Sequence, residues 1–152
     1  MKLAEALLLR ADLQKKIVSL RLRLTRAALV QQGERPVEDP ANLLTKLEGA
    51  LKEFETVLFK INQANLEQRL ADGRSVTAGL ARRDALVAHH GAVAALIAAA
   101  TKAPERYSTR EIPWVVTVDV AQLQVKLEDL GRQLLELNAA IQAANWRIEI
   151  EW

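Results

Sequence analysis

Apolar residues recur at alternating steps of three and four between residues 120 and 144. The row consists of Val120, Leu123, Leu127, Leu130, Leu134, Leu137, Ile141 and Ala144. This spacing keeps all of them on one side of an α-helix, as at the a and d positions of a coiled coil. Asp119 precedes the row and Gln122 follows three residues later, which is typical of a capped helix start. The pattern therefore predicts a helix over residues 119–146 that lies against other helices.

Helical spacing in the rest of the chain predicts helices over about residues 3–32, 40–70 and 77–102. A break around Gly33 and a polar turn at residues 71–75 separate them, and Asp39 before Pro40 marks the start of the second helix. Because the connections are short, consecutive helices should run antiparallel. The sequence thus predicts a mainly α protein of four long helices, an antiparallel bundle or a set of coiled-coil hairpins, in a single domain of residues 1–152.

The predicted buried row of the second helix is Leu44, Leu47, Leu51, Phe54, Leu58, Ile61, Asn65 and Gln68. The predicted row of the third helix is Leu80, Leu86, Val93, Leu96 and Ile97. Alanines cluster near the end of this third helix, between residues 92 and 100. Since small side chains allow helices to approach closely, we expect that end to be deeply packed.

Two short segments depart from helical spacing and predict β-strands near residues 111–118 and 147–152. The second segment alternates between polar and apolar residues from Arg147 to Trp152. The helix between the two segments would be about 40 Å long, whereas six extended residues reach only about 20 Å. If these strands pair, the simplest route is between two chains.

The first helix carries two apolar rows. One follows the heptad spacing from Leu3 to Ala27 and includes Arg10, whereas the other lies on roughly the opposite side. A helix of a lone bundle has one apolar stripe and one solvated face, so the second row predicts contact with another subunit. We expect a homo-oligomer with interface residues Leu8, Val18, Leu22, Leu29, Trp114, Ile148, Ile150 and Trp152.

Composition and charge narrow the class of protein. A chain of 152 residues suits one domain, and the lack of cysteine excludes disulfides, thiolate metal sites and a thiol nucleophile. The net charge of +2 is too small to indicate a nucleic-acid partner. Residues 1–33 nevertheless carry seven Lys or Arg against two acids, a surplus that acidic helices can neutralise. With no long apolar run and no signal peptide, we expect a cytoplasmic protein that does not engage a membrane.

Arg10 is the first candidate for a polar site, because it stands in the predicted buried row of the first helix. An unpaired buried charge costs several kcal/mol, so Arg10 needs partners. The hairpin places it near Asn62 and Asn65. Three interpretations are open: these amides or a nearby acid satisfy the charge, the group forms a pocket for a small anion, or Arg10 is simply exposed.

A second charged group, Arg82, Arg83 and Asp84, lies near the start of the third helix. It is either an ion pair at the surface or an interface, or part of a ligand site. His89 and His90 are neighbours that point about 100° apart on a helix, so they are poorly placed to hold one metal. Sequence motifs for di-iron, zinc, phosphate-loop and serine-hydrolase sites are absent. We expect no metal, no cofactor and no catalytic residue, and the sequence does not support an enzyme.

Several short motifs resemble small bacterial proteins labelled septicolysin. They are MKLAEAL at residues 1–7, RAD at 10–12, ADGR at 71–74, LARRD at 80–84, TVDV at 117–120 and IQAANW at 141–146. The resemblance covers nearly the whole chain. It implies an uncharacterised family of helical proteins, and the label suggests a thiol-activated, pore-forming cytolysin.

Three functions follow from these observations. The first is a structural or interaction protein that acts by binding itself or another protein. The second is a protein that binds a small anion, or an enzyme, with a pocket around Arg10, Asn62 and Asn65. The third is a membrane-active protein, which depends only on the resemblance.

Overall fold

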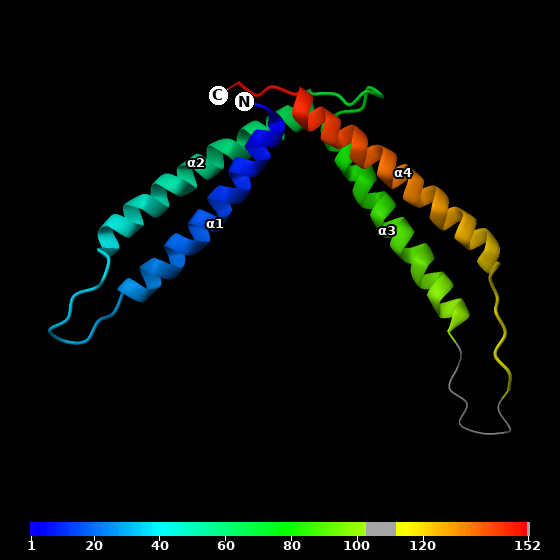
Figure 1. Cartoon of the computed structure of the whole chain (residues 1–152), viewed down its shortest axis with the longest axis horizontal. Helices are drawn as coiled ribbons and strands as arrows, with labels where there is room; N and C mark the ends of the chain where they lie inside the picture. Colours follow the sequence, from blue (N-terminus) through cyan, green and yellow to red (C-terminus); the bar gives the residue numbers. More distant parts are fainter. Residues whose placement is uncertain (103–111, 152) are drawn as a thin grey trace. The chain divides into compact units, whose positions relative to one another are not determined.

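The computed structural model describes residues 1–102 and 112–151, which contain four α-helices (Figure 1). They are α1 (Leu3–Ala27), α2 (Pro40–Glu67), α3 (Val76–Thr101) and α4 (Val120–Arg147). The predicted mainly helical fold is confirmed. Contacts divide the chain into two compact units: Met1–Val76 with Gln142–Trp152, and Thr77–Ile141. The single domain stays a prediction, and each unit is described separately.

Aspartates cap the starts of two helices as the sequence predicts. The carboxylate of Asp39 accepts hydrogen bonds from the backbone N–H groups of Ala41 (3.2 Å) and Asn42 (3.3 Å). Asp119 accepts one from the backbone N–H of Gln122 at 3.0 Å. These bonds satisfy N–H groups that have no partner inside the helix, and so they set where α2 and α4 begin.

Helix α1 ends at Ala27 and not near residue 32 as predicted. Glu38, just before α2, forms an ion pair with Arg23 in the last two turns of α1. Any further turn of α1 would therefore extend beyond the start of α2, where no helix covers it. A helix end without tertiary contacts is marginal in water, so the chain leaves the helix once packing stops.

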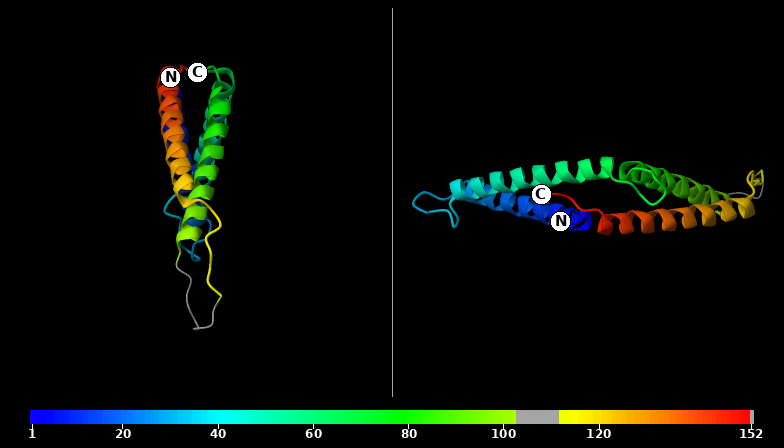
Figure 2. Two further views of the ribbon diagram at one scale, coloured as in Figure 1. Left: turned by 90° about the vertical axis from the view of Figure 1, so that its right-hand side faces the viewer. Right: turned by 90° about the horizontal axis from the view of Figure 1, so that it is seen from above.

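The first unit is built on an antiparallel pair formed by α1 and α2, which lie side by side in Figure 2. Leu20, Leu43, Leu47 and Ala50 form a buried cluster, and Ile17, Leu24 and Ala27 pack against it. These α1 residues belong to the predicted heptad row. That row therefore holds the hairpin together.

The predicted buried row of α2 is wrong in part. Its buried residues are Leu43, Leu47, Ala50, Val57, Ile61 and Ala64, whereas Leu44 and Leu51 are half exposed. The true row is turned around the helix relative to the predicted one, and Leu47 and Ile61 belong to both. Ala50 and Ala64 belong to the true row, and such small side chains permit a neighbouring helix to approach closely.

The C-terminal segment pairs with the N-terminus of the same chain, and neither predicted strand is present among the residues that the structure describes. The backbone N–H of Leu3 donates to the carbonyl of Ile148 (2.9 Å), and that of Ile150 donates to the carbonyl of Met1 (2.8 Å). Within this segment only Glu149 forms a β-bridge, with Lys2. Because α1 starts at Leu3, the partner stretch is too short for a strand. Residues 112–118 form no strand either, and residues 103–111 and Trp152 lie outside the described part.

The second unit is the antiparallel pair of α3 and α4 (Figures 1 and 2). Every residue of the predicted α4 row is buried or half-buried, which confirms it. In α3 the row facing inward consists of Gly79, Arg83, Leu86, His90, Val93, Ile97 and Ala100. Leu86, Val93 and Ile97 were predicted, but Leu96 is exposed. The alanine-rich end is not deeply packed: Ala92, Ala95, Ala98 and Ala99 are exposed because α4 covers only one side of α3.

Leu130→Ala is expected to lower the free energy of unfolding by about 2–5 kcal/mol, the range for truncating a packed side chain. Leu130 is 4% exposed in the α4 row, whereas Leu135 of the same helix is 72% exposed. The matched variant Leu135→Ala should therefore change stability by less than about 0.5 kcal/mol. Urea unfolding of both variants measures the difference, and equal costs would show that α4 does not pack through this row.

Ile148→Ala is expected to cost a similar amount, about 2–5 kcal/mol, because Ile148 is 4% exposed beside the N-terminus. Ile112, which is 89% exposed, supplies the control variant Ile112→Ala. Thermal unfolding followed by circular dichroism gives the comparison. If Ile148→Ala unfolds at the wild-type temperature, the terminal pairing does not stabilise the first unit.

Candidate functional site

Arg10 lies half-buried on α1, and its Nε is buried without a hydrogen-bond partner among the described residues. Asn65 is half-buried and Asn62 is exposed. Within the described chain no hydrogen bond or ion pair joins Arg10 to either amide. A buried donor without a partner costs about 1–3 kcal/mol. The structure therefore places Arg10 as the sequence suggests but does not assemble the predicted polar pocket around it.

The charged group at the start of α3 separates into two interactions. Arg83 donates to the Oδ1 of Asp84 from Nε (3.2 Å) and from Nη2 (3.0 Å). Arg82 instead reaches α4, where its Nη2 donates to the Oε1 of Gln133 at 3.3 Å. The three residues do not converge on one point. This arrangement fits the structural interpretation of the group better than a ligand site.

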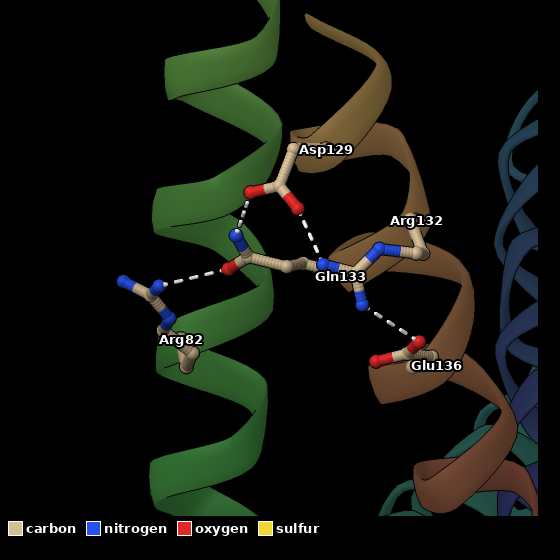
Figure 3. Close-up of polar contacts among 5 residues, drawn as sticks. All are labelled: Arg82, Asp129, Arg132, Gln133 and Glu136. Carbon is tan, nitrogen blue, oxygen red and sulfur yellow. Dashed lines mark hydrogen bonds and ion pairs between the residues drawn. The ribbon is translucent and has the colours of Figure 1, made fainter. Parts of the chain in front are cut away.

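Arg82 joins a chain of polar contacts along α4 that the sequence analysis missed (Figure 3). Gln133 donates from Nε2 to Asp129 at 2.7 Å. Arg132 lies between two acids: it pairs with Asp129 and donates to the Oε1 of Glu136 at 3.0 Å. All five residues are at least partly exposed. These α4 residues are three or four positions apart, and that spacing alone indicates that their side chains can contact one another on a helix.

This polar chain changes the acidity of Asp129. Hydrogen bonds from Arg132 and then Gln133 lower the pKa of the Asp129 carboxyl, although loss of some hydration opposes this. A carboxyl with a lowered pKa stabilises the folded state above its ordinary pKa, and that contribution is lost as the pH falls through the folded-state value. The hydrogen bonds that Asp129 accepts from Arg132 and Gln133 within α4 should therefore weaken in acid.

The described residues contain no cluster of three or more His, Asp or Glu side chains arranged to hold a metal ion. His90 lies on the inner side of α3, with its Nε2 4.0 Å from the position that a Cβ atom at Gly131 of α4 would take. His89 is exposed. The two histidines thus point in different directions, as their spacing predicts.

The predicted interface residues fall into two groups. Leu8, Val18, Leu22, Leu29 and Trp114 are exposed. Ile148 and Ile150 are buried against the N-terminus of their own chain. The two isoleucines were assigned to an interface because they lacked a partner within the chain, and that reason no longer applies. Trp152 lies outside the described residues.

The sequence analysis did not identify one exposed apolar surface, the outer face of α3. Alanines occupy this face at steps of four and three: Ala81, Ala85, Ala88, Ala92, Ala95 and Ala99. They lie roughly opposite the row that faces α4, and all of them are exposed. The spacing of three and four that predicts α4 also identifies this alanine row. The sequence prediction treats these alanines as buried and therefore does not include a second, exposed row.

Helix α3 is also long and apolar enough, by length and composition alone, to cross a membrane. The sequence expectation was based on uninterrupted apolar runs, which α3 lacks because of Arg82, Arg83 and Asp84. Only 11% of its most apolar stretch is buried inside the structure. Because α3 carries no Asp, Glu, Lys or Arg beyond Asp84 and most of its apolar stretch is uncovered, it would gain from a partner surface.

Asp129→Asn tests the acid sensitivity of the polar contacts within α4. The variant is expected to unfold at a slightly lower temperature than wild type at pH 7, because the carboxylate no longer pairs with Arg132. Since the pKa of Asp129 lies below its ordinary value of 3.8, the difference between the two proteins should shrink once the pH falls below that value. Glu128→Gln, at a neighbouring exposed position, is the control. A difference that stays constant from pH 7 to pH 2.5 would contradict the assignment.

Comparison with known proteins gives two similarities. A family model described as "Family of unknown function (DUF6847)" matches residues 10–150. The chain is also similar to a crystal structure of a functionally unknown conserved protein from Corynebacterium diphtheriae. The two share 31% identity with a TM-score of 0.89, over 99% of each chain.

No curated protein matches the chain. The resemblance to proteins labelled septicolysin stays a prediction. Because the family model spans most of the described helices, the chain belongs to the DUF6847 family, whose function is unknown.

Proposed function

We propose that the protein acts through self-association, in which the outer face of α3 packs against the same face of a second copy. The observation that carries this proposal is the combination of an apolar helix with very little burial: 11% of its most apolar stretch is covered. Neither a cofactor nor a catalytic residue is needed for such a function.

The alanine row suits a close helix pair. Helices pack with axes about 8–10 Å apart depending on the side chains at the contact, and alanine permits the short end of that range. Close approach brings the two backbones within dispersion contact along the whole row. The six alanines cover residues 81–99, which is about 27 Å of helix.

A second copy is the occupant that this face fits best. A two-fold axis places the same patch of both chains opposite each other, so the patch must be complementary to itself. A row made only of alanine meets this condition in an antiparallel pair, because every small side chain faces another small side chain. The exposed row of α1, which includes Leu8, Val18 and Leu22, supports the same proposal as a second apolar surface.

A membrane is the alternative partner for α3, and its length and composition favour this second candidate. Arg82, Arg83 and Asp84 oppose it. They lie in the first third of α3, so a spanning helix would have to keep these charges near the membrane surface, which shortens its apolar part. Leakage from phospholipid vesicles on addition of the purified protein would favour the membrane alternative.

Ala88→Glu is expected to weaken self-association, because it places a charge in the middle of the alanine row. Both residues are good helix formers, so α3 itself should persist. Light scattering over a range of micromolar concentrations should show wild-type oligomers and an apparent dissociation constant raised at least about tenfold in the variant. Circular dichroism should show unchanged helical content.

Ala139→Glu is the matched control, since Ala139 is an exposed alanine on α4 outside the proposed interface. It should leave the oligomeric state unchanged. A wild-type protein that is monomeric at all micromolar concentrations would show that the proposal is wrong. So would equal dissociation of the two variants.

A further inference from the structure

The loop that joins α1 and α2 borders a hollow of about 940 Å³ that is open to solvent. Its walls come from the last turns of α1 and from residues 29–38. Gly33 adopts a left-handed conformation with φ +90°, and the backbone N–H of Glu34 donates to the carbonyl of Gln31 at 3.0 Å. These features turn the chain back over the end of α1. Small-molecule pockets have volumes of about 300–1,000 Å³, so the hollow has a suitable size.

The charges in the hollow leave an excess of arginine. Three arginines and two glutamates line it, but Arg23 and Glu38 neutralise each other: the Nε of Arg23 donates to the Oε2 of Glu38 at 2.8 Å, and a second bond makes the pair bidentate. The hydrogen bond from Arg23 lowers the pKa of the Glu38 carboxyl, which keeps the pair charged at neutral pH. The other charged residues of the lining are two arginines, Arg26 and Arg35, and one acid, Glu34. Neither arginine forms an ion pair with any described residue.

A neighbouring hollow of about 470 Å³ adds to this positive charge. It shares Arg23 and is lined by Lys16 and Lys46 against a single acid, Glu53. Neither lysine forms an ion pair within the described chain. Of the basic residues in positions 1–33, Lys16 and Arg26 therefore line these two hollows without an ion pair within the described chain.

The remaining wall of the larger hollow is apolar. Ala27, Leu29, Val30, Pro36 and Val37 line it beside the arginines. Leu29 and Val37 are almost fully exposed, so they gain from being covered. A ligand with one charged end and one hydrocarbon part would satisfy both kinds of wall at once.

We propose that this hollow binds a small organic anion, a carboxylate or phosphate monoester with a hydrocarbon body. Arg26 and Arg35 bind the charged head, because guanidinium groups donate in a fork that matches both carboxylate and phosphate. The aliphatic wall covers the body. A carboxylate, with one negative charge, balances the net charge of the three arginines and two glutamates in the lining. The site lies in the first unit and does not depend on the proposed self-association through α3.

Octanoate and octyl phosphate are suitable probes, with acetate and inorganic phosphate as forms without the hydrocarbon body. Isothermal titration calorimetry of the full chain should show saturable binding of at least one eight-carbon probe, and at least tenfold weaker binding of the short forms. The double variant Arg26→Gln/Arg35→Gln should bind at least tenfold more weakly than wild type. Arg35→Gln alone, outside any helix, gives the same test if the double variant does not fold.

Arg21→Gln is the matched control, because Arg21 is an exposed arginine of α1 that does not line the hollow. It should bind the probes as wild type does, and so should Ala88→Glu, which separates this site from self-association. Vesicles of phosphatidylglycerol and of phosphatidylcholine distinguish the sources of the anion. If wild type binds phosphatidylglycerol vesicles and the double variant does not, a lipid head group is one source of the anion. If wild type binds the eight-carbon probes but not these vesicles, the ligand is a free amphiphile. Absence of wild-type binding to both eight-carbon probes, or equal binding by the double variant, would overturn the proposal.

Discussion

A helix in a two-helix hairpin can bury only the side that faces its neighbour, and this geometric limit governs the whole protein. In the first unit the seam is the cluster around Leu20 and Leu47, and in the second it includes Leu86 and Leu130. In each unit, every helix buries a single row of side chains against its neighbour. Apolar residues that lie elsewhere on the same helices must therefore stay in water or find a surface outside the hairpin.

The chain ends strengthen the first unit in a way that the helices alone cannot. Ile148 and Ile150 cover the open end of the α1–α2 pair, while Glu149 between them faces out and pairs with Lys2 at 2.6 Å. The backbone bonds to Met1 and Leu3 link residues that are far apart in the sequence. Because these contacts close a loop of nearly the whole protein, forming them costs chain entropy on folding, which the burial of the two isoleucines offsets.

Charged residues have two roles in this fold. Some connect helices: Arg23 fixes the loop before α2 through Glu38, and Arg82 reaches Gln133 across the second hairpin. Others, such as Arg26, face a hollow without an acid of their own. Surface ion pairs contribute little to stability. Arginines that have no partner in the structure are therefore better candidates for binding a ligand than those in surface ion pairs.

The sequence by itself determined the four helices, the two aspartate caps and the rows of α1 and α4, because helix periodicity and capping depend on residues close together in the chain. Only the tertiary structure decided the rest. In α2 two apolar rows are compatible with the local pattern, and the approach of α1 selects the one with Ala50 and Ala64. The segment after α4 alternates as a strand would, but its partner is the N-terminus, which a local pattern cannot identify. The hollow beside Arg26 depends on how the connecting loop folds back over α1. The outer alanines of α3 are exposed because one neighbouring helix covers one side, and that too is a property of packing rather than of spacing.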